Sequence, residues 1–187
     1  MKKILLTFAM AAFFAIGMNA QVTVAEPDFA EETLLLISDS EGLLLNRENG
    51  TVKTKAGASL YLTGIGKVKS RLTLAGTNSV SKVKGASTTR LIVKAKDNKT
   101  DPNSFINIFQ FEIKGKERRY QLAETGTLSK AETNNLSSVD YKAKKYGENS
   151  YLLVLEDLAP GEYGIVMGDP NNDNTKNSMK VTTFTVE

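Results

Sequence analysis

From residue 32 onward the chain is a succession of short apolar segments separated by turn-forming residues. The stretch FINIFQFEI (105–113) alternates in polarity, YLLVL (151–155) is a short apolar run, and Thr182, Phe184 and Val186 alternate near the end. Alternation at period two is typical of strands, because successive side chains point to opposite faces. No part of this region has a helical period. The pattern predicts an all-β fold: a single antiparallel β-sandwich of immunoglobulin or fibronectin type, with a β-barrel as the alternative.

Three local signals refine this prediction. Asn49-Gly50 predicts a hairpin turn, since both residues tolerate a positive φ. KGK (114–116) predicts a second turn, following a strand in which Phe105, Phe109, Phe111 and Ile113 share one face. Tyr163 follows Pro160-Gly161 at the start of a strand, so we expect a tyrosine corner in which its hydroxyl bonds to backbone upstream.

The N-terminus has the composition of a secretory signal peptide. Lys2 and Lys3 precede an apolar core (4–16) and mostly small residues (17–20). We expect cleavage after Ala20, with cleavage after Gly17 as the alternative. This divides the chain into a signal peptide (1–20), a flexible lead-in (21–31) and one β-sandwich domain (32–187). The sequence thus predicts export to the periplasm, cell surface or extracellular space, without a lipid anchor and without a membrane-spanning segment after cleavage.

The chain contains neither histidine nor cysteine. Disulfides are therefore absent, and an exported domain must be held together by packing alone. Zinc sites with nitrogen or sulfur ligands, and catalysis by Ser-His-Asp or Cys-His arrangements, are excluded on this chain. We therefore expect a protein that is not an enzyme, with a structural or interaction role in the cell envelope.

Charge is distributed unevenly along the chain. Residues 53–119 hold fifteen basic and four acidic residues, whereas the segments on either side are acidic. The basic part predicts, as an alternative function, a binding module for an anionic surface polymer. Lys114, Lys116, Arg118 and Arg119 are its candidate residues. Nucleic acid is not an expected partner, because the aromatic residues of this part are better explained as core. A solvated basic face without a ligand is the simpler interpretation.

Two further hypotheses rest on oxygen-bearing side chains. Asp169, Asn171 and Asp173 match the first three ligand positions of a calcium loop, but Asn174 replaces the glycine and Lys180 the bidentate glutamate. A hairpin tip is the simpler explanation of this stretch, so we expect no cofactor, with calcium as the alternative. A carboxylate-dependent glycoside hydrolase, the second alternative function, would draw its acids from Glu156, Asp157 or Glu162.

Two blocks also carry a resemblance. LAPGEYGI (158–165) with the terminal TTFTV (182–186), and KAKDNKTDPNSFINIFQFEIKGKERR (94–119), resemble a group of uncharacterised exported proteins from Bacteroides-like bacteria. The resemblance implies export and a β fold. It transfers no functional residues, and the ligand, partner and oligomeric state stay open.

Overall fold

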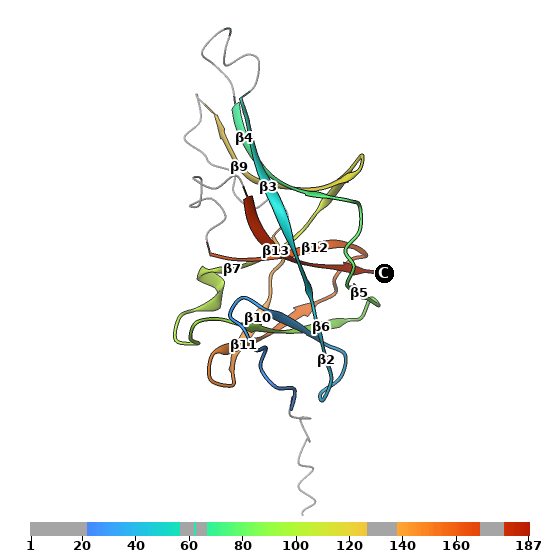
Figure 1. Ribbon diagram of the computed structural model, residues 1–187, viewed down its shortest axis with the longest axis vertical. Coiled ribbons are helices and arrows are strands. Elements are labelled where there is room, and N and C mark those ends of the chain that lie inside the picture. Colours follow the sequence, from blue (N-terminus) through green and yellow to red (C-terminus); the bar gives the residue numbers. More distant parts are fainter. Residues whose placement is uncertain (1–21, 57–61, 63–66, 127–137, 169–177) are drawn as a thin grey trace, which may run out of the picture.

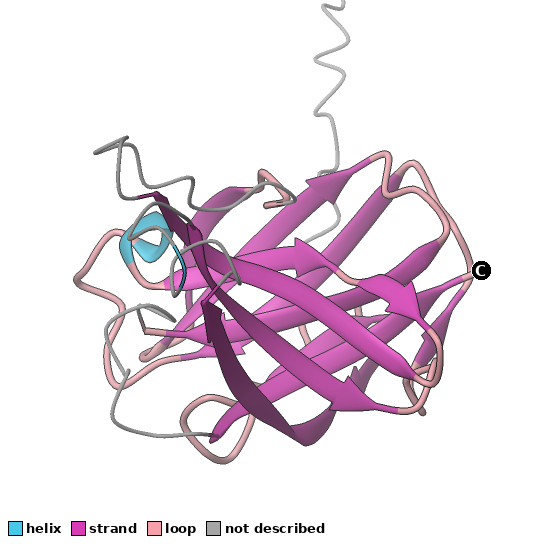
Figure 2. Cartoon of the chain, turned by 90° about the horizontal axis from the view of Figure 1, so that it is seen from above, coloured by secondary structure: helices cyan, strands magenta, loops and turns pink. Residues whose placement is uncertain are grey.

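The computed structural model describes residues 22–56, 62, 67–126, 138–168 and 178–187. Its elements are strands, with one short 3-10 helix, η1 (Pro102–Ser104), ahead of β7 (Figure 2). Two sheets pack face to face, and one of them is curled into a half-barrel. The predicted all-β sandwich is therefore confirmed, and the curled sheet includes an element of the barrel alternative.

The smaller sheet has five antiparallel strands and forms the lower part of Figure 1. Its order is β10 (Lys142–Tyr146), β11 (Ser150–Glu156), β6 (Thr88–Lys94), β1 (Thr33–Leu36) and β2 (Gly42–Leu44). The two edges of this sheet are thus β10 and β2.

The larger sheet, here called the curled sheet, has eight strands. Its order is β7 (Ile106–Gln110), β12 (Gly161–Met167), β13 (Ser178–Val186), β3 (Asn46–Ala56), β4 (Lys67–Ala75), β9 (Glu117–Gly126) and β8 (Glu112–Lys114), and β5 (Lys82–Val83) pairs in parallel with β13. The first and last strands of this order, β7 and β8, are separated only by Phe111. Because one piece of chain reaches both edges, the sheet curls around an interior of its own.

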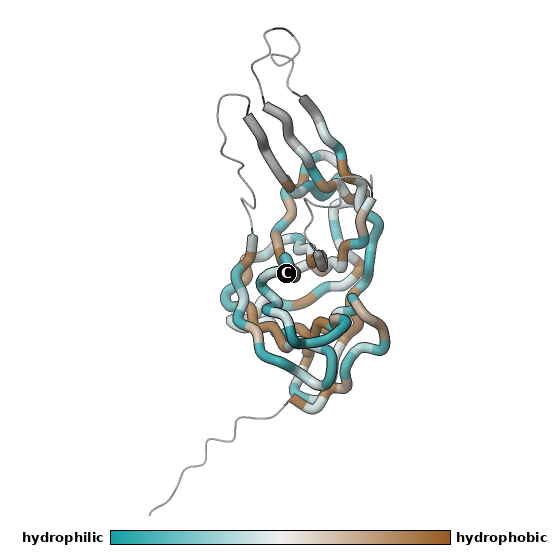
Figure 3. Tube along the Cα trace, turned by 90° about the vertical axis from the view of Figure 1, so that its left-hand side faces the viewer, coloured by the Kyte–Doolittle hydropathy of each residue, from teal (hydrophilic) through white to brown (hydrophobic). Residues whose placement is uncertain are grey.

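The alternation of side chains produces separate apolar cores, two of which involve the curled sheet. The main core lies between the sheets, and Leu91 and Leu153 of the five-stranded sheet meet Tyr163 and Phe184 of the curled sheet there. A second core lies inside the curled sheet. It contains Leu72, Leu74, Phe109, Phe111, Tyr120, Leu122, Val166 and Val181. Strand β12 and the second half of β13 are thus buried on both faces, and brown apolar stretches recur inside the body in Figure 3.

Gly50 shows that the predicted Asn49-Gly50 hairpin is wrong. Both residues lie inside β3, where they pair with β13. Gly50 points into the curled sheet, and a Cβ there would lie 2.4 Å from Leu72 Cδ1. Close packing against Leu72, and not a turn, therefore accounts for the glycine at this position. The predicted turn at 114–116 is confirmed, with Gly115 at φ 64°.

The tyrosine corner is confirmed. The Tyr163 hydroxyl donates to the carbonyl oxygen of Ala159 at 2.6 Å, four residues upstream. The predicted aromatic face is only partly right, because β7 is buried on both sides. Phe109 points into the curled sheet, whereas Ile108 faces the main core and Ile113 is exposed.

Residues 22–31, predicted as a flexible lead-in, are hydrogen-bonded to the domain. Val22 and Val24 pack against the outer face of the five-stranded sheet. The Asn149 N–H donates to the Glu26 carboxylate at 2.9 Å, and Lys94 Nζ donates to the Pro27 carbonyl at 2.7 Å. This segment covers part of a sheet face that would otherwise be exposed. Among the described residues, no helix is long and apolar enough to cross a membrane.

Candidate functional site

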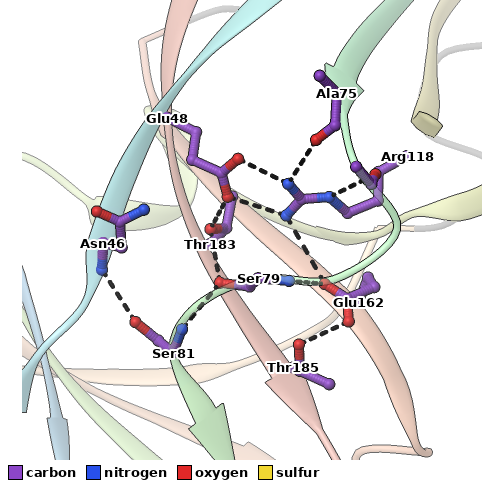
Figure 4. A network of polar contacts seen from close by, with 10 residues as sticks. Asn46, Glu48, Ala75, Ser79, Ser81, Arg118, Glu162, Thr183 and Thr185 are labelled. Atoms are coloured by element: carbon purple, nitrogen blue, oxygen red, sulfur yellow. Dashed lines mark hydrogen bonds and ion pairs between the residues drawn. The ribbon is translucent and has the colours of Figure 1, made fainter. Parts of the chain in front are cut away.

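A cluster of buried charged and hydroxyl side chains closes one end of the curled sheet's interior (Figure 4). We call it the Arg118 cluster. It joins Glu48 of β3, Arg118 of β9, Glu162 of β12, Thr183 and Thr185 of β13, and Ser79 of the β4–β5 connection. Alternation explains the position of Arg118, because Arg118, Tyr120 and Leu122 point to the same side of β9.

Arg118 is the cation of this cluster, and its guanidinium group makes several hydrogen bonds. Its side chain is 1% exposed and makes a bidentate pair with Glu48, at 3.0 Å from Nη1 to Oε1 and 2.6 Å from Nη2 to Oε2. The same guanidinium donates to the carbonyl oxygens of Ala75, at 3.2 Å, and Gly76, at 3.4 Å. It also lies 5.9 Å from the centre of the Phe111 ring. Such a forked geometry suits arginine and excludes lysine.

Glu162 supplies the second buried carboxylate. Its Oε2 lies 3.7 Å from Arg118 Nη1 and accepts the Ser79 N–H at 2.7 Å, and its Oε1 accepts the Thr185 hydroxyl at 2.6 Å. Ser79 and Thr183 hydroxyls are 2.8 Å apart, and Thr183 donates to Glu48 at 2.6 Å. The cluster therefore pins the β4–β5 connection into the end of the curled sheet.

This arrangement is suited to holding strands together rather than to acid–base chemistry. Glycoside hydrolysis needs two carboxylates facing a space for sugar and water, whereas Glu48 and Glu162 face one arginine between them. Of the other predicted acids, Glu156 is exposed and pairs with Lys142 at 2.7 Å, and Asp157 is exposed beside it. The structure does not bring these acids together with Glu162, which is 4% exposed.

The four residues predicted to bind a polyanion do not lie on one surface. Lys114 and Lys116 are exposed at the β8–β9 turn, whereas Arg118 points into the protein. Arg119 points to the opposite face and pairs with Glu117 at 2.9 Å. Hydrogen bonds from Arg119, and then from Lys53, lower the pKa of the Glu117 carboxyl. Arg118 therefore cannot contribute to an exposed basic surface.

The calcium hypothesis falls outside the described residues, since Asp169, Asn171 and Asp173 all belong to 169–177. Within the described part of the chain, no group of three or more acidic side chains is placed to hold a metal ion.

An exposed hollow of about 730 Å³ lies beside strand β2. Its lining includes Leu43 and Leu44 of β2 and Val80 and Lys82 of the β4–β5 region. Leu43 is 41% exposed, Leu44 53% and Val80 82%. Two smaller hollows, of about 410 and 400 Å³, lie beside Met167 and Asn107.

The two edges of the five-stranded sheet differ in how they are protected. Strand β10 carries Lys142, Lys144 and Lys145, all exposed, and edge lysines discourage pairing with another chain. Strand β2 is Gly-Leu-Leu and has no charge. An uncharged apolar edge beside an open hollow is a surface on which another chain can add a strand.

Comparisons with protein families, with curated proteins and with solved structures each return no match.

Proposed function

We propose that the chain is an exported, immunoglobulin-like β-sandwich protein of a bacterial cell envelope, with an interaction or structural role and no catalytic activity. The apolar edge β2 carries this proposal, because exposed leucines beside a hollow are costly in water unless another surface covers them. Export follows from the signal-peptide pattern of residues 1–20. The engagement of Glu48 and Glu162 within the Arg118 cluster supports the absence of hydrolase chemistry.

The proposal is tested by photo-crosslinking in living cells. A photoreactive amino acid at Leu43 is expected to give a cross-linked species of defined mass, recovered from the envelope or the medium. The same amino acid at Lys144, on the guarded edge β10, is the matched control and is expected to give none. Equal cross-linking at both positions, recovery in the cytoplasm, or a turnover abolished by Glu162→Gln would each contradict the proposal.

A second candidate function, binding of an anionic surface polymer, is favoured by the register of β3 and β4. Lys53 lies directly opposite Arg71. Like charges opposite one another destabilise a sheet unless something compensates them. Glu117 contacts Lys53 at 3.4 Å and also pairs with Arg119. A polyanion lying along this face would relieve the repulsion between β3 and β4.

Retention on immobilised heparin and on lipopolysaccharide tests this second function. Under the proposal, a Lys53→Gln, Arg71→Gln double variant elutes at clearly lower salt than the wild type. A Lys142→Gln, Lys144→Gln variant carries the same charge change on β10 and is expected to elute with the wild type. If both variants weaken retention equally, the protein binds through its net charge and this face has no specific role.

A further inference from the structure

The outer edge of β2 presents backbone groups that can pair with another strand. Leu45 donates to the Thr33 carbonyl at 2.9 Å, and Ile37 donates to the Glu41 carbonyl at 2.9 Å. In an antiparallel ladder the bonded residues alternate, so the odd-numbered residues of this segment face β1. The N–H and C=O groups of Gly42 and Leu44 therefore point away from β1, along the outer edge of the sheet.

The side chains of this edge lie on two sides of the sheet. Leu43 pairs with the main-core residue Leu35 and shares its side of the sheet, whereas Gly42 and Leu44 lie on the outer side. A Cβ at Gly42 would lie 3.1 Å from Val24 Cγ1, so a larger residue is disfavoured there. The outer side of β2 thus has an exposed leucine and, two residues away, a glycine that Val24 covers.

We propose that β2 pairs in antiparallel fashion with β2 of a second copy, about a two-fold axis at Leu43. This inference rests on the interaction role proposed above and names its partner. In this register Gly42 of each copy lies opposite Leu44 of the other, and the two exchange N–H···O=C bonds in both directions. Each Leu44 then lies beside the Val24 side chain that covers the opposite glycine. The two Leu43 side chains meet on the inner side, and the two five-stranded sheets become one sheet of ten strands.

Charge complementarity favours a second copy over an unrelated chain. Asp39 and Glu41 precede β2, whereas Arg47 and Lys82 lie beyond its other end, together with Glu32. Antiparallel pairing brings the acidic end of each copy to the basic end of the other. Asp39, Arg47 and Lys82 also have partners within the copy, in Arg90, Glu31 and Glu187. The charges therefore set orientation more than strength, and the self-complementary leucines suit an isologous interface.

The test is the mass of the mature chain in solution, measured by sedimentation over a protein concentration of about 1 to 500 μM. The wild type is expected to form a concentration-dependent dimer. Leu44→Pro removes only the outward N–H and leaves the bonds to β1 intact, because proline is tolerated at edge positions whose N–H faces solvent. Leu44→Lys keeps the N–H but places a charge on the edge.

Both variants are expected to raise the dimer dissociation constant at least about tenfold, as loss of a central interface residue does, with unchanged circular dichroism. Lys144→Leu on β10 is the control and is expected to leave the constant unchanged. A wild type that stays monomeric throughout, or a dimer that survives both Leu44 substitutions, overturns the inference. If the chain is monomeric but Leu43 cross-links to a different protein in cells, the interaction role stands and the self-pairing falls.

Discussion

The substitution Arg118→Ala tests how much the Arg118 cluster contributes to the stability of the fold. The substitution removes the bidentate partner of Glu48, the ion-pair partner of Glu162 and two donors to backbone carbonyls. Two carboxylates then remain close together with no cation between them. Breaking a buried ion pair in this way costs about 3–5 kcal/mol. Because the Glu48 side chain is 23% exposed to solvent, water compensates in part, and we expect a loss near 3 kcal/mol.

Urea denaturation of the mature chain measures this loss. With a denaturant slope of about 2–3 kcal/mol/M, the midpoint falls by about 1–1.5 M. Thermal unfolding is expected to shift down by about 6–12 °C, since each kcal/mol corresponds to about 2–4 °C at this chain length.

Arg119→Ala is the matched control, one residue further along β9. Its side chain is 29% exposed on the opposite face of the strand and pairs with Glu117 across solvent. Exposed pairs contribute little because water and salt screen them, so the control is expected to unfold close to the wild-type midpoint. Equal shifts for Arg118→Ala and Arg119→Ala would refute the claim that the cluster fastens the end of the curled sheet.

Other substitutions test the packing around this cluster. Gly164→Ala is expected to cost about 1–3 kcal/mol in urea unfolding, because its Cβ would lie 2.6 Å from a ring carbon of Phe109; an unchanged midpoint would show that the interior is loose. Tyr163→Phe removes the hydroxyl bond to Ala159 and is expected to cost about 0.5–1.5 kcal/mol by the same assay; no loss would show that the corner is not stabilising. Burial raises the pKa of Tyr120 from 10.0 to about 12. Its neutral form is favoured in the folded state, so the associated stability is complete below pH 10 and is lost between pH 10 and about 12. Tyr120→Phe should lessen that alkaline fall in melting temperature, and an identical fall in both proteins would contradict the assignment.

The strand pattern was sufficient to predict the fold class because alternation is a local property. In the apolar run 151–155, Tyr151, Leu152, Leu153 and Leu155 are buried, and the corner at Tyr163 follows from the few residues around it. The hairpin prediction at Asn49-Gly50 failed for a different reason. A glycine that permits a turn also permits close packing, and only the position of Leu72 across the curled sheet distinguishes the two.

The Arg118 cluster was missed because its partners are far apart in sequence. Glu48 and Arg118 are separated by 70 residues, and their contact depends on how the sheet curls. One local signal was present, since Arg118 shares the period-two face of Tyr120 and Leu122 and so lies on an apolar side of β9. The apolar edge β2 was missed as well, because Leu43 and Leu44 have the composition of core residues. Their exposure follows only from the strand order, which ends at β2.

Amide hydrogen exchange at β2 tests most directly whether this edge is the surface through which the protein acts. Leu43 and Leu45 face β1, so their amides are expected to be protected at every protein concentration. The Gly42 and Leu44 amides face outward and are expected to exchange rapidly in dilute protein and to become protected as the concentration rises. Exchange at Gly42 and Leu44 that stays rapid at high concentration, while the rest of the sheet stays protected, would contradict pairing of the chain with itself through β2.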